Sequence, residues 1–132
     1  MKSQRLNRYK GTASEHFACA DIWLQGYKAY LIPSDVFDLI LKAENHLFKL
    51  QVKSSSFSTN KNSSVSFNLT RGCNSKGKYN KEDIDGWIFV NLINKKVCYY
   101  DILELNNKWK KTVSLEDFEK HTLERFLKKK GI

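Results

Sequence analysis

Hydrophobic and polar positions alternate along residues 36–55, which is the pattern of β-strands. In "FKLQVKSS" (48–55) the apolar residues fall on one face of a strand, and Lys49, Gln51 and Lys53 fall on the other. In the preceding segment, "VFDLILKA" (36–43), we expect Asp38 to lie inside the strand. A turn at 43–46 separates the two segments. They are therefore predicted to form a hairpin.

Helical spacing of apolar residues predicts helices at both ends of the chain. The first spans about 12–26, capped by Thr12 or Ser14, after a basic N-terminal arm at 1–10. The last spans about 114–130, with acidic residues early and lysines late, as the helix dipole favours. Further strands are expected at about 28–33, 65–70, 87–92 and 97–102. The order predicts one α/β domain, 1–132, in which helices flank a mixed central sheet.

The charge of the chain favours a polyanionic partner. The 132 residues include 23 Lys and Arg and 14 Asp and Glu, which gives a net charge of +9. Nucleic acid is the simplest partner for such a field. An anionic membrane surface is the weaker alternative, and no apolar run is long enough for a spanning helix. The basic start, "MKSQRLNRYKG", lacks the apolar stretch of a signal peptide, so we expect a cytoplasmic protein.

Polar residues at otherwise apolar positions suggest a metal site. Glu15 lies on the first predicted helix, and the hairpin would bring Asp38 within reach of Gln51. An unpaired carboxylate among core residues is costly. A divalent cation would offset this cost by binding the Asp38 carboxylate and the Gln51 amide oxygen. Lys53 could then stabilise charge on a phosphate or help to position an attacking water.

These residues resemble the active-site pattern of the PD-(D/E)XK nuclease superfamily. Glu15, then Asp38, then Gln51-Val52-Lys53 stand in its order, and the resemblance covers about residues 11–92. The similar small members are archaeal Holliday-junction resolvases and a group I intron-encoded homing endonuclease of cyanobacteria. The resemblance implies a restriction-endonuclease-like core and a DNA endonuclease that uses Mg²⁺ or Mn²⁺. Its site residues would be Glu15, Asp38, Gln51 and Lys53, the first three holding metal.

Two departures from the family pattern leave alternatives open. Gln51 stands where most of the superfamily has an acid, which fits the intron-encoded branch or a catalytically inactive DNA-binding relative. Pro33 and Asp35 are close but not adjacent, so Asp35 is a rival to Asp38 as the metal ligand. We therefore expect a homing endonuclease that cuts a long duplex site. A junction resolvase and an inactive DNA-binding protein are the alternatives.

Polar loops and strands offer contacts to double-stranded DNA. A glycine-containing basic loop can approach a phosphate backbone closely. The residues expected to touch DNA are Lys61, Asn68, Arg71, Lys76 and Lys78. Because one small site must rebind to cut a second strand, we also expect a homo-dimer or homo-tetramer.

Overall fold

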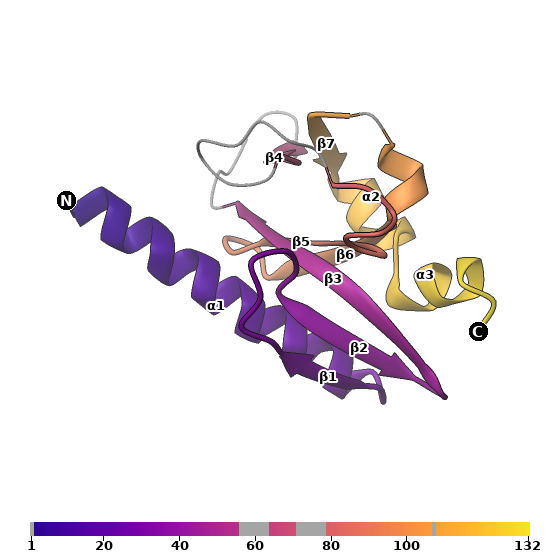
Figure 1. Ribbon diagram of the computed structural model, residues 1–132. Coiled ribbons are helices and arrows are strands. Elements are labelled where there is room, and N and C mark those ends of the chain that lie inside the picture. The colour runs from indigo at the N-terminus through magenta and orange to yellow at the C-terminus, as the bar shows by residue number, and fades with distance from the viewer. Residues whose placement is uncertain (1, 56–63, 71–78, 107) are drawn as a thin grey trace.

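A five-stranded sheet forms the centre of the molecule, with its strands in the order β1-β2-β3-β5-β6. The computed structural model describes residues 2–55, 64–70, 79–106 and 108–132 (Figure 1). Its elements are α1 (Lys2–Leu24), β1 (Lys28–Leu31), β2 (Leu39–Ala43), β3 (His46–Ser55), β4 (Ser64–Asn68), β5 (Gly86–Asn91), β6 (Lys96–Asp101), the 3-10 helix η1 (Ile102–Leu105), β7 (Lys110–Ser114), α2 (Leu115–Lys120) and α3 (Leu123–Lys129). Neighbouring strands are antiparallel except β3 and β5, which are parallel. The predicted mixed sheet flanked by helices is confirmed.

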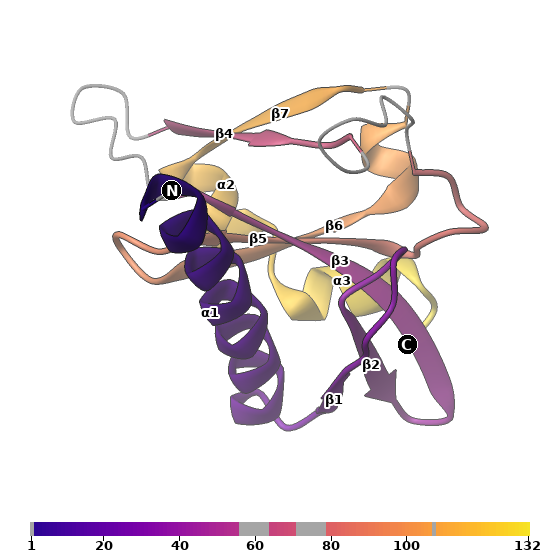
Figure 2. The same ribbon diagram turned by 60° about the vertical axis from the view of Figure 1, so that its left-hand side comes forward.

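Different elements cover the two faces of this sheet (Figures 1 and 2). Helices α1 and α3 pack on one face, where Ile22 and Phe126 join Leu50 of β3 in a buried cluster. On the other face lie α2 and a two-stranded sheet of β4 and β7, and Phe67 packs there against Phe89. Strand β3 therefore lies between the two layers, and its alternating side chains enter both.

Helix α1 extends to Lys2, so the separate basic arm predicted at 1–10 was wrong, as were the caps proposed at Thr12 and Ser14. The arm residues contain no proline and include several good helix formers, which lets the helix continue through Gly11. Its C-terminal end is as expected, because Gly26 follows with a positive φ of 93°. Within the described part of the chain, no helix is both long and apolar enough to cross a membrane.

The C-terminal helix predicted over about 114–130 is two helices, α2 and α3, so that prediction was wrong in its extent. Ser114 caps α2 as expected, but Thr122 caps a second helix by accepting a backbone N–H from its first turn. His121 lies at the break, where its carbonyl oxygen accepts the Tyr99 N–H at 2.8 Å.

The break between α2 and α3 allows the chain to pass around one edge of the sheet. Phe118 of α2 belongs to the buried cluster on the β4–β7 side, whereas Phe126 of α3 belongs to the cluster on the α1 side. A continuous helix could not place both rings in these two layers, since i and i+8 side chains lie close to the same helix face.

Strands β2 and β3 form the predicted hairpin, joined by a two-residue turn at Glu44 and Asn45. Their last pair is Leu39 with Leu50. Asp38 therefore immediately precedes β2, and the prediction that it lies inside the strand was wrong by one residue. Beyond Leu50, β3 continues to Ser55 beside β5 alone, which leaves a gap on its β2 side.

Candidate active site

Asp38 occupies the gap where β2 leaves β3. Its backbone N–H donates to Leu50 O at 3.0 Å, one residue out of register with the β2–β3 pairing. Its side chain then replaces the missing strand, because Oδ2 accepts the Val52 N–H at 2.8 Å. This bond fixes the carboxylate beside β3, and Oδ1 remains as the oxygen that could bind a cation.

Glu15 of α1 lies close enough to Asp38 for the two carboxyls to interact electrostatically. Burial, and after it the negative charge of Asp38, raises the pKa of Glu15 to about 7. Burial also raises the pKa of Asp38, while the Val52 N–H and the Lys53 charge oppose the increase. Two carboxyls thus share a half-buried site in which ionising both is unfavourable.

Lys53 adds a cation to this pair. Its Nζ donates to the Thr70 carbonyl at 3.1 Å and lies 5.8 Å from the centre of the Tyr79 ring. These contacts come from the β4 side of the sheet, where alternation along β3 directs Lys53. Since Lys53 also lowers the pKa of Asp38, its charge acts across the site. The contacts of Thr70 and Tyr79 with Lys53 depend on long-range packing, so they could not be predicted from the sequence.

Gln51 lies on β3 one residue beyond Leu50, which is the last residue of β3 to pair with β2. It is half-buried and pairs with Trp87 of β5 on its other side. The expected alternation of β3 is confirmed, since Leu50 and Val52 on either side of it are buried. The structure therefore brings Glu15, Asp38 and Lys53 to one region, and β3 carries Gln51 two residues before Lys53.

These residues fit a hard divalent cation. Two carboxyls and an amide supply oxygen donors, which Mg²⁺ and Mn²⁺ prefer. A cation would also offset the burial and the Asp38 charge that together raise the pKa of Glu15. No group of three His, Cys, Asp or Glu side chains suited to a metal occurs within the described ranges. The third candidate donor here is the neutral amide of Gln51, so such a site has one negative charge fewer than a three-acid site.

Other acidic residues considered from the sequence lie elsewhere. Asp35 is exposed in the bend that follows Pro33, whereas Asp38 is half-buried and interacts with Glu15 and Lys53. The two acids are thus in different environments, and Asp38 is the better placed to be a ligand.

Only one of the expected DNA-contacting residues lies in the described part of the chain. Asn68 is exposed near the end of β4, and its Oδ1 accepts both the backbone N–H and the hydroxyl of Thr70. Lys61 and the three basic residues Arg71, Lys76 and Lys78 are outside the described ranges.

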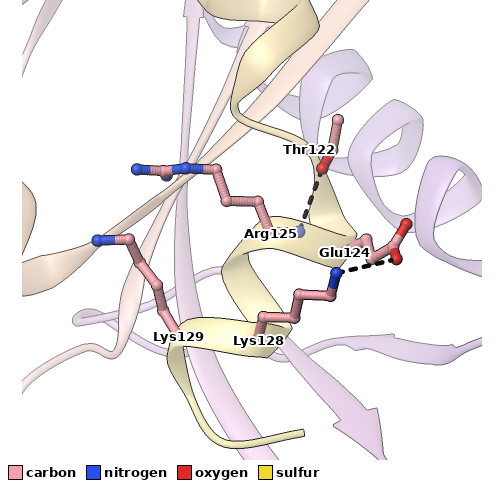
Figure 3. Close-up of a pocket in the computed structure, with 5 residues that line it drawn as sticks. All are labelled: Thr122, Glu124, Arg125, Lys128 and Lys129. Carbon is pink, nitrogen blue, oxygen red and sulfur yellow. Dashed lines mark hydrogen bonds and ion pairs between the residues drawn. The ribbon is translucent and has the colours of Figure 1, made fainter.

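A separate hollow of about 500 Å³ lies beside α3 and is lined by Thr122, Glu124, Arg125, Lys128 and Lys129 (Figure 3). Its cations already have acidic partners. Arg125 makes two hydrogen bonds to Glu104, at 2.9 and 3.3 Å, and Lys128 lies 3.6 Å from Glu124. We therefore assign this group to holding α3 against η1.

An acid on the first helix, an acid before the second strand and a lysine on the third strand are the arrangement of a PD-(D/E)XK nuclease. The sequence matches the model of the PD-(D/E)XK endonuclease family over residues 6–126, which include all four site residues. The chain belongs to this family, and the resemblance inferred from the sequence is confirmed. Comparison with curated proteins gives no match.

A solved structure with a similar fold is that of a bacterial homing endonuclease, I-Ssp6803I. The two chains are 17% identical and superpose with a TM-score of 0.63, over 81% of this chain and 74% of that one. At this level of identity the likeness establishes a shared fold.

Proposed function

We propose that the protein is a Mg²⁺- or Mn²⁺-dependent endonuclease that hydrolyses phosphodiester bonds in double-stranded DNA. The observation that carries the proposal is the meeting of Glu15 and Asp38 in the gap beside β3, with the Lys53 charge acting on the same site. Family membership supports endonuclease chemistry, and the net charge of +9 supports a DNA substrate.

Each site residue has a distinct proposed role. Glu15, Asp38 and Gln51 would hold the cation, which supplies Lewis-acid stabilisation of phosphate charge and a more acidic bound water. Lys53 would donate a hydrogen bond to a non-bridging phosphate oxygen, where negative charge builds up during attack. The Thr70 carbonyl would orient the Lys53 ammonium, as it does through the 3.1 Å hydrogen bond.

We further propose that the substrate is a long duplex site of the kind cut by a homing enzyme. A structural neighbour with a similar fold is a homing endonuclease, and the Gln51 position resembles the intron-encoded branch of the family. Base-specific reading needs polar side chains that reach a groove while phosphate contacts set the register. Strand β4 offers Ser66 and Asn68 on its exposed face for this purpose.

Assembly into a homo-dimer or homo-tetramer belongs to the same proposal. One site cuts one strand, so two copies are needed to cut a duplex without rebinding. Large apolar side chains are exposed where α1 meets the edge strand β1: Trp23 is 48% exposed, Leu24 87% and Tyr30 45%. This corner is a candidate contact between copies, and light scattering with and without DNA measures the subunit number.

The test is a competition between two substrates under equal salt and metal. A randomised duplex library and an immobile four-way junction are incubated together with the protein and Mg²⁺, and parallel reactions contain EDTA. We expect metal-dependent cutting with a long sequence enriched among the cut duplexes. Symmetrical cutting of the junction without enrichment would replace the homing proposal with a resolvase. Binding without cutting in Mg²⁺ or Mn²⁺ would indicate the inactive DNA-binding protein.

A further inference from the structure

A polar pocket of about 330 Å³ lies between α1, the end of β3 and β4, outside the group of four site residues. Its polar lining consists of Asn7 and Lys10 from α1, Ser54 and Ser55 from β3, and Ser66 and Asn68 from β4. These groups provide an ammonium, three hydroxyls and two amides, and none of them is a carboxylate. The pocket therefore favours an anion that can accept several hydrogen bonds.

The side of α1 that faces the sheet is apolar over the core and becomes polar next to this pocket. Ile22 and Ala18 pack in the core, and steps of three or four residues along the same face then lead to Ser14, Lys10 and Asn7. Figure 2 shows these N-terminal turns extending beyond the central sheet toward β4. The helix thus continues past the apolar core and presents polar groups where a core-covering helix would end.

Hydrogen bonds through Thr70 connect the pocket residue Asn68 to the proposed catalytic residue Lys53. The Thr70 carbonyl accepts a hydrogen bond from Lys53, and the Thr70 N–H and hydroxyl both donate to Asn68 Oδ1, at 2.9 and 2.7 Å. Because that oxygen is engaged, the amide NH₂ of Asn68 is the group available as a donor to a ligand.

The distance between the pocket and the proposed active site follows from the positions of their residues along β3 and α1. Ser55 follows Lys53 by two residues on β3, which is roughly 7 Å at the rise of a strand. Lys10 precedes Glu15 by five residues on α1, which is roughly 7.5 Å at the rise of a helix. B-DNA rises about 3.4 Å per nucleotide along its axis, and neighbouring phosphates of one strand are further apart than this because the strand winds around the axis, so either distance corresponds to one or two nucleotides.

We infer that this pocket binds a backbone phosphate of the cleaved DNA strand, one or two nucleotides from the scissile phosphate. The inference rests on the proposed function and adds the residues that hold the strand in register. Lys10 supplies the charge, and Ser54 and Asn68 supply hydrogen-bond donors to the phosphate oxygens, while Ser66 Oγ shares a hydrogen bond of 3.0 Å with Thr112 Oγ1. Leu92, the apolar member of the lining, packs against the adjoining sugar. These are positioning residues, since they act on a phosphate that does not react.

Two pocket variants and one matched control test the inference. Lys10→Gln removes the charge. Asn68→Asp keeps an oxygen for Thr70 but replaces the NH₂ donor by a negative oxygen. Lys28→Gln removes an exposed lysine from β1, away from the pocket. Affinity for a labelled duplex of roughly 40 base pairs and random sequence is measured in EDTA over a series of salt concentrations. Circular dichroism melting verifies that every variant is folded.

We expect Lys10→Gln to lower affinity about three- to tenfold and to reduce the salt slope by about one, because one phosphate contact is lost. Asn68→Asp should weaken binding by more, whereas Lys28→Gln should leave the slope unchanged. A second arm places single neutral methylphosphonates around the cut mapped with wild-type protein. One position, one or two nucleotides from that cut, should weaken wild-type binding much more than Lys10→Gln binding.

The outcomes separate this inference from the proposed function. If wild-type protein binds and cuts DNA while both pocket variants match Lys28→Gln in affinity and slope, the pocket assignment is wrong and the nuclease proposal stands. The assignment also fails if every methylphosphonate affects wild-type and Lys10→Gln proteins equally. If the wild-type protein neither binds nor cuts DNA, the proposed function and this inference fail together.

Discussion

Replacing Glu15 by glutamine should stabilise the protein when no metal is bound. Glu15 is half-buried near Asp38, and burial together with that charge raises the pKa of its carboxyl from 4.5 to about 7. At a pH above about 7 the native state must ionise a carboxyl that its surroundings disfavour, whereas the unfolded chain ionises it in water. Glutamine has nearly the same shape and carries no charge, so the variant avoids this cost.

The size of the effect follows from the two pKa values. At about 1.36 kcal/mol per pKa unit, the difference between 4.5 and about 7 sets an upper bound of about 3.4 kcal/mol. Glu15 is partly exposed, and water screens its interactions, so we expect about 1–2 kcal/mol. For a chain of 132 residues this raises the melting temperature of the variant by about 3–8 °C.

The raised pKa of Glu15 determines how the stability difference between Glu15→Gln and the wild-type protein changes with pH. A raised folded-state pKa means that the native protein keeps this proton to higher pH than the unfolded chain does. The stability of the wild-type protein therefore falls, through this group, as pH rises from about 4.5 to about 7. The advantage of Glu15→Gln should be complete at about pH 8 and should disappear toward pH 4.5.

Calorimetric melting in EDTA across this pH range measures the difference, with Glu119→Gln on the exposed side of α2 as the matched control. Adding Mg²⁺ should then raise the melting temperature of the wild-type protein more than that of Glu15→Gln, because ligand binding stabilises the native state. If Glu15→Gln melts at or below the wild-type temperature at about pH 8 in EDTA, the reasoning about crowded carboxyls is refuted.

Two further predictions concern the site and the core. Gln51→Glu should keep substantial nuclease activity with a changed metal preference, whereas Gln51→Leu should lose about a hundredfold or more in single-turnover cleavage; an unaffected Gln51→Leu would remove this residue from the metal site. Gly86→Ala should destabilise the fold by about 2–3 kcal/mol in urea unfolding, because the added Cβ would lie 2.4 Å from Tyr100 O and 2.7 Å from Phe126 Cε1. Unchanged stability in this variant would contradict the close packing of β5 against β6 and α3.

The hairpin and the candidate site were predictable because their signals are local. Alternation along 48–55 placed Gln51 and Lys53 on the face opposite the buried row, and β3 has that pattern. The order of Glu15, Asp38 and Lys53 matched a family whose model covers them. The contacts that position these side chains were not predictable. The Val52 N–H binds Asp38 only because β2 ends at Leu39, and strand length is set by packing.

The two errors in helix extent have a common physical origin. Residues 1–10 are rich in basic side chains, which suggested an arm, yet α1 continues through them from Lys2 and carries Lys10 to the polar pocket. At the other end, residues 114–130 have the charges of one helix, but Thr122 begins another so that Phe118 and Phe126 reach opposite faces of the sheet. In both places the packing of the helices against the sheet and its layers decides where a helix begins and ends. Local helix propensity carries no information about this packing.

The most direct test of the proposed active site is single-turnover cleavage, with Mg²⁺, of the duplex that the wild-type protein cuts. Wild-type protein is compared with Asp38→Asn, Lys53→Ala and the control Asp35→Asn, and DNA affinity is measured for each protein in EDTA. The account predicts that Asp38→Asn and Lys53→Ala each lose about a hundredfold or more in rate while their DNA affinity stays within about tenfold of the wild-type value, and that Asp35→Asn cuts like wild type. Cleavage at the wild-type rate by Asp38→Asn and Lys53→Ala, or loss of cleavage in Asp35→Asn alone, would contradict it.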